Sequence, residues 1–83
     1  MSYRQQINLS EPVLDWDKVV HKNVRSDDGQ AVGNIVAVDS GFIIVTSQGG
    51  MGRYRIPKSF VEKYDGAEVF LKVPIIALDG FKV

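Results

Sequence analysis

The sequence has no cysteine, and its 83 residues include one histidine and one tryptophan. Without cysteine the chain has no disulfide, no thiolate zinc site and no thiol nucleophile. General-base catalysis needs an orienting partner and a nucleophile, which a single histidine, His21, does not reveal in a sequence. We expect a solvated or capping role for His21. The sequence therefore predicts no catalytic residue, no metal ligand and no cofactor, and thus a protein that is not an enzyme.

An excess of charge is also lacking, because ten basic residues balance ten acidic ones. Proteins that bind a nucleic-acid backbone usually carry a positive excess, so this class is disfavoured, although a neutral protein can still hold a local basic patch. The polar N-terminus leads into no apolar run of signal-peptide length, and no apolar run is long enough to cross a membrane. We expect a cytoplasmic protein without direct membrane insertion.

Turn residues, in contrast, are frequent and regularly spaced. Such spacing, with short β-rich segments between the turns, is typical of an all-β meander or barrel. We expect one domain over residues 13–83, preceded by a flexible arm over residues 1–12. Its fold is predicted to be a small all-β barrel of five to six antiparallel strands. The turn signals are Asp27-Asp28-Gly29, Asp39-Ser40-Gly41, Gln48-Gly49-Gly50, Asp65-Gly66 and Asp79-Gly80.

The segment from residue 53 to 73 predicts a strand, a helical turn, a tight turn and a second strand. In the first strand, alternation places Tyr54 and Ile56 on one face and the two arginines beside them on the other. Ser59 and Glu62 have the spacing of a capping box, which predicts a short helical turn near residues 58–64. Asp65-Gly66 then supplies the backbone that ends the turn.

Apolar strand positions outnumber those that one small interior can hold. The run from Phe42 to Val45 is apolar on both faces, so some of its residues should lie outside the barrel. We therefore predict a partner-binding surface around Ile43, Val45 and Phe70, together with the terminal segments. The apolar tail from Ile75 to Leu78 either packs back across the barrel, which we favour, or belongs to a dimer interface. Trp16 is expected to cover one end of the barrel rather than to anchor a partner.

One basic cluster, Arg53, Arg55 and Lys58, surrounds Tyr54. Its arginines suit a carboxylate-rich or phosphate-bearing partner, although a solvated face of mixed charge is the simpler interpretation. The glycine-rich residues 48–52 precede a strand, whereas a phosphate loop opens a helix, so we predict a wide hairpin loop. This loop would let Met51 and Arg53 contact a partner. The aspartates beside glycines are explained by turn chemistry, since their spacing does not fit a calcium loop.

The ordered pattern resembles the PRC-barrel superfamily over about residues 14 to 74. His21 departs from this pattern, because many members have glycine there, and so does the glycine-rich loop over residues 47–52. The matching segments are Trp16-Asp17-Lys18-Val19-Val20 with Asn23-Val24, Ser26-Asp27-Asp28-Gly29-Gln30-Ala31-Val32-Gly33-Asn34-Ile35, Ile56-Pro57-Lys58-Ser59-Phe60-Val61 and Asp65-Gly66-Ala67-Glu68-Val69-Phe70-Leu71.

The resemblance implies a non-enzymatic barrel used as a protein–protein adaptor, with no family catalytic residues to carry over. Barrels of this family serve as a scaffold in a photosynthetic reaction centre, contact a ribosomal protein in a ribosome-maturation factor, and resemble division-apparatus adaptors in archaea. We accordingly expect a stand-alone adaptor that binds a protein partner, in a cell-division or membrane-associated scaffold complex. The surplus of apolar strand positions further predicts self-association as a homodimer. The alternative is a ribosome-maturation or RNA-associated factor that uses Arg53, Arg55 and Lys58.

Overall fold

The computed structural model describes residue 13 and residues 15–83. The predicted flexible arm over residues 1–12 lies outside the described residues. Short alternating segments bounded by turns form most of the described chain, as the spacing of the turn residues predicts.

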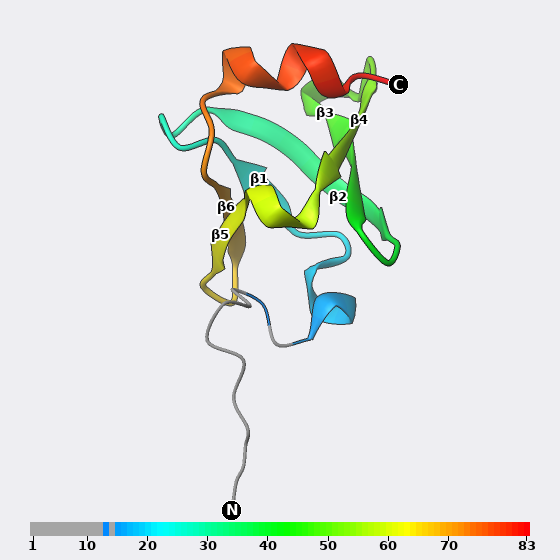
Figure 1. Cartoon of the computed structure of the whole chain (residues 1–83), viewed down its shortest axis with the longest axis vertical. Helices are drawn as coiled ribbons and strands as arrows, with labels where there is room; N and C mark the ends of the chain where they lie inside the picture. The colour runs from blue at the N-terminus through cyan, green and yellow to red at the C-terminus, as the bar shows by residue number, and fades with distance from the viewer. Residues whose placement is uncertain (1–12, 14) are drawn as a thin grey trace, which may run out of the picture.

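Six strands of the described chain form one curled sheet with the shape of a half-barrel (Figure 1). The spatial order is β4-β3-β2-β1-β6-β5, and neighbouring strands pair antiparallel except β1 and β6, which run parallel. The predicted small all-β barrel fold is confirmed, whereas the expectation that every strand pairs antiparallel is wrong for β1 and β6. The strands are β1 (Asn23–Arg25), β2 (Ala31–Val38), β3 (Phe42–Ser47), β4 (Arg53–Pro57), β5 (Val61–Tyr64) and β6 (Glu68–Leu71).

The core lies on the concave face of the sheet, where alternate strand residues point inward. Ile43 of β3 is paired with Ile56 of β4, Val45 lies on the same side of β3 as Ile43, and all three are fully buried. As predicted, Ile56 and the half-buried Tyr54 share this face, while the neighbouring arginines are exposed. The other fully buried apolar residues are Val19, Val24, Ile35, Val61, Val69, Leu71 and Leu78.

Two irregularities curl the long strand β2. The pairing with β1 shifts register opposite Ala31 and Gly33, and the pairing with β3 shifts between Ile35 and Ala37. Gly33 has φ +151°, and a Cβ atom there would lie 1.9 Å from the carbonyl oxygen of Thr46. A bulge next to Gly33 therefore bends the strand, and glycine is required there because a side chain would collide with the backbone of β3.

Short 3-10 segments cover the sheet: η2 (Trp16–Val19), η4 (Lys58–Phe60) and η5 (Ile75–Phe81). In Figure 1, η5 crosses one end of the half-barrel and η2 lies at the opposite end. Leu78 of η5 is fully buried, and the ring of Phe81 meets that of Phe60 edge-on, with 5.1 Å between their centroids. The C-terminal segment thus packs back across the barrel, as the favoured prediction stated, and Trp16 also packs against the core.

The predicted helical turn over residues 58–64 is wrong beyond residue 60. Only the three residues of η4 are helical, without a side-chain cap at Pro57, and the chain then enters β5. Val61 is buried opposite Leu71 of β6, and Tyr64 pairs with Val69. Pairing with β6 outweighs a capping box that offers at most two local hydrogen bonds, and β-branched and aromatic residues favour a strand.

Candidate functional site

The convex face of β3 and β4 carries apolar and cationic side chains in register. Because alternate residues point outward, Phe42 and Ile44 of β3 lie on the side opposite the core, and each is only half-buried. Ile44 is paired with Arg55 and Phe42 with Pro57. Val36 of the neighbouring strand, at the second bulge, is 40% exposed. We call Val36, Phe42, Ile44, Arg55 and Pro57 the outer patch.

The centre of the outer patch is an arginine stacked on an aromatic ring. The guanidinium carbon of Arg55 lies 3.6 Å from the ring centroid of Phe42, and its Nη2 lies 3.9 Å from Oδ2 of Asp39. Asp39 is itself held by the turn, since its Oδ1 accepts hydrogen bonds from the backbone N–H groups of Gly41 (3.1 Å) and Phe42 (2.9 Å). A fixed carboxylate and a fixed ring together orient the guanidinium, whose side chain remains 47% exposed.

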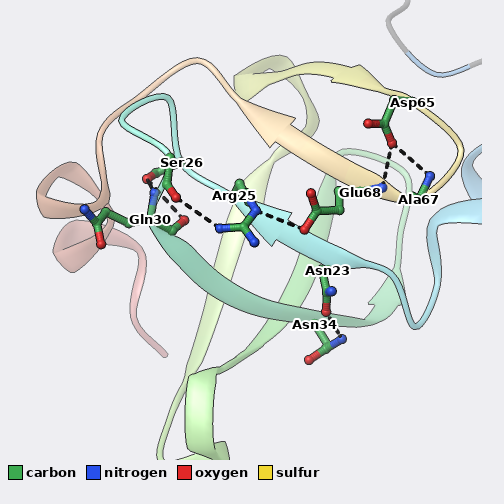
Figure 2. Close-up of polar contacts among 9 residues, drawn as sticks. Asn23, Arg25, Ser26, Gln30, Asn34, Asp65, Ala67 and Glu68 are labelled. Carbon is green, nitrogen blue, oxygen red and sulfur yellow. Dashed lines mark hydrogen bonds and ion pairs between the residues drawn. The ribbon is translucent and has the colours of Figure 1, made fainter.

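A polar band borders the outer patch on the same convex face. Asn34 of β2 donates through Nδ2 to Oδ1 of Asn23 on β1 at 2.7 Å, and Glu68 of β6 follows Asn23 in register. Arg25 donates through Nε to Oε2 of Glu68 at 3.0 Å and through Nη1 to the carbonyl of Gly29 at 3.1 Å (Figure 2). These contacts tie β1 to both of its neighbours across the outer surface.

The residues predicted to bind a partner do not form one surface. Ile43 and Val45 are fully buried, so the predicted surface around them is replaced by the outward residues beside them in the chain. Phe70 points outward on β6, where Nζ of Lys63 lies 4.9 Å from its ring centroid, and β1 and β2 separate it from β3. Met51 is 90% exposed in the loop between β3 and β4.

The predicted basic cluster is also divided. Lys58 lies with Nζ 4.8 Å from the ring centroid of Trp16 and donates to the carbonyl of Ser40 at 3.4 Å. Arg55 is engaged by Phe42 and Asp39. Arg53 is exposed, and among the described residues no carboxylate lies within ion-pair distance of it. Two of the three cations are thus held by contacts within the chain.

Two of the turn aspartates, Asp39 and Asp65, accept hydrogen bonds from backbone N–H groups of their own turns, as the sequence predicts. Hydrogen bonds from the N–H groups of Glu68 and Ala67 lower the pKa of Asp65 (Figure 2). A hydrogen bond from the hydroxyl of Ser26, the one buried polar side chain among the described residues, lowers the pKa of Asp28. The described residues contain no group of three or more His, Cys, Asp or Glu placed to hold a metal ion. They also contain no helix long and apolar enough to cross a bilayer.

Sequence reasoning missed Phe42 and Ile44. The signal for them was the pairing of β3 with β4, because alternation in β4 clearly assigns Ile56 inward and Arg55 outward. Ile43, the register partner of Ile56, therefore points inward, and Ile44, the register partner of Arg55, points outward.

Comparisons with known proteins add no further constraint. A scan against protein-family models, a search of curated proteins and a search of solved structures each returned no match.

Proposed function

We propose that this chain is a non-enzymatic adaptor of the PRC-barrel type that binds a protein partner through the outer patch. The observation that carries the proposal is the stack of Arg55 on Phe42 beside the outward Ile44. Arginine and aromatic side chains are enriched among the residues that dominate protein–protein binding energy, and a preoriented side chain loses less entropy on binding. The partner surface that fits is apolar, with a carboxylate for the free donors of Arg55.

The PRC-barrel assignment rests on the resemblance, and two features of the fold support it. The chain forms a small, strongly curled sheet, as a barrel domain of this kind requires. His21 has φ +74°, a backbone conformation that favours glycine, and glycine is the residue that many family members have at this position. We further propose that the adaptor acts in the cytoplasm, in a cell-division or membrane-associated scaffold, and as a homodimer.

The alternative function, an RNA- or ribosome-associated factor, ranks below the adaptor. It requires Arg53, Arg55 and Lys58 to meet phosphates together, but Arg55 and Lys58 are engaged by aromatic rings of the chain itself. Releasing them would cost about 0.5–1 kcal/mol each. A protein partner can bind Arg55 in its stacked position, without this cost.

The test is photo-crosslinking in cells with a benzoylphenylalanine placed at position 44. We expect a defined crosslinked protein from position 44 and none from position 72, because Lys72 is exposed outside the outer patch. Ile44→Asp should abolish capture of this protein by the purified chain in high salt, and Lys72→Asp should preserve it. Light scattering should show a dimer for the chain alone.

Three outcomes would contradict the adaptor proposal. The first is crosslinking from positions 44 and 72 to the same broad set of proteins, which signifies random encounter. The second is full retention of the partner by Ile44→Asp with unchanged folding by circular dichroism. The third is a retained fraction that contains RNA and disappears after nuclease treatment or in high salt, which favours the alternative function.

A further inference from the structure

A second surface, which shares no residue with the outer patch, lies where the loop between β3 and β4 faces the C-terminal segment. Figure 1 shows this hairpin tip and the C-terminus side by side. Between them is an open groove of about 310 Å³. The residues that line it are Ser47, Met51, Gly52, Arg53, Tyr54, Lys82 and Val83.

The groove combines apolar walls with positive charge. Met51 on one wall is 90% exposed, and Val83 on the other is 75% exposed. Arg53 and Lys82 supply two cations, and no carboxylate side chain lines the groove. The side chain of Lys82 lies 3.6 Å from Asp79, but both are largely exposed, so this ion pair is weak.

Both walls of the groove are held in place by hydrogen bonds within the chain. The N–H of Val83 donates to the carbonyl of Arg53 at 3.1 Å, and Lys82 forms an antiparallel bridge with Tyr54, so the C-terminal segment is fastened to the edge of β4. Across the groove, the hydroxyl of Ser47 accepts a hydrogen bond from the N–H of Gly52 at 2.9 Å and closes the loop. A groove with fixed walls binds at a lower entropic cost than one that must form on binding.

We propose that this groove binds a short, extended, acidic peptide segment of a partner protein. An apolar side chain of the segment lies between Met51 and Val83, and flanking carboxylates meet Arg53 and Lys82. Charge complementarity selects the occupant, because the lining carries cations and no acidic side chain in a chain of zero formal net charge. The volume is at the lower end of the range for ligand sites, so it suits one or two side chains rather than a folded domain.

The test is fluorescence anisotropy of the whole chain with a fluorescein-labelled peptide of alternating leucine and aspartate. We expect saturable binding that weakens as salt is added, and about tenfold or greater loss of affinity with Arg53→Glu. Met51→Ser should also weaken binding, because it removes an apolar wall and leaves the core intact. Lys72→Glu is the matched control, with the same charge change at an exposed site outside the groove, and should bind as the parent chain does.

Several results would overturn the peptide proposal. They are no binding of the leucine–aspartate peptide, equal binding of a leucine–asparagine peptide, and equal weakening by Lys72→Glu and Arg53→Glu. Binding to vesicles of phosphatidylserine and phosphatidylcholine that is lost with Met51→Ser, without peptide binding, would assign the groove to a membrane surface instead. Ile44→Ser removes the apolar side chain from the outer patch without adding charge to the face that also carries Arg53, and it should leave peptide binding unchanged. This proposal therefore stands or fails independently of the outer patch.

Discussion

Gly33 of β2 packs directly against the backbone of β3. A Cβ atom at this position would meet the carbonyl of Thr46 at 1.9 Å, and backbone cannot move aside as a flexible side chain does. We expect Gly33→Ala to destabilise the fold by about 3 kcal/mol or more, measured by urea unfolding.

Gly29→Ala is the control for this substitution. Gly29 also has a positive φ, +81°, but a Cβ atom there would meet nothing within 4 Å. Gly29→Ala should lower the free energy of unfolding by about 1–2 kcal/mol, from backbone conformation alone. Equal losses for the two variants would show that contact with Thr46 does not determine the requirement for glycine at position 33.

The carboxylate of Asp65 makes the stability of the fold depend on pH. Its pKa is lowered by the N–H groups of Glu68 and Ala67, so the folded state favours the charged carboxylate. The stabilisation is fully present above the pKa of the unfolded chain, near 4, and is lost as the pH falls through the lower folded value. We expect Asp65→Asn to be less stable near neutral pH and to show a flatter loss of stability below about pH 4.

Thermal unfolding across a pH series measures this effect. Glu62→Gln on β5 is the control, because it removes an exposed carboxylate for which the structure gives no hydrogen bond to the backbone. Parallel pH profiles for the parent chain and Asp65→Asn would exclude the proposed role of this carboxylate.

At the scale of elements, η5 covers the core through one face. Leu78 is fully buried, while Ile76 on the same element is 77% exposed. We expect Leu78→Ala to cost about 2–5 kcal/mol in urea unfolding, and Ile76→Ala less than about 0.5 kcal/mol. Similar small effects for both would mean that η5 does not contribute to the stability of the fold.

The sequence predicts where the strands lie more fully than it predicts which strands pair with each other. The limits of β2 follow the turn signals of the sequence, which bound the strand on both sides. The strand β5 was missed because residues 58–64 carry a local helix signal, and only the non-local pairing of Val61 with Leu71 overrides it. Likewise, Phe42-Ile43-Ile44-Val45 is apolar throughout, so alternation within that run cannot tell which residues face outward and form the candidate site.

At the scale of the whole molecule, the parallel pair of β1 and β6 holds the two halves of the chain together. Val24 and Val69 are register partners, and both are fully buried. Each valine-to-alanine change should cost about 1.5–3 kcal/mol. We expect the double variant to depart from additivity by about 0.5 kcal/mol or more, measured as a double-mutant cycle in urea.

A distant pair provides the control for this cycle. Val24→Ala combined with Ile76→Ala should be additive, because Ile76 is exposed on η5. Additivity for Val24 with Val69 as well would show that the two strands do not act as one packing unit. Sequence alone could not predict this pair, since strands so short give no indication of which neighbour they join.

The strand order also has a consequence for how the chain folds during synthesis on a ribosome. The strands β2, β3 and β4 are consecutive hairpins, so they can assemble from local contacts while the rest of the chain is still being made. The first strand, β1, acquires its second neighbour only when β6 emerges, more than half the chain later. Until then the nascent sheet carries an unpaired edge at β1, and aggregation or chaperone binding during translation is expected to concentrate at that edge.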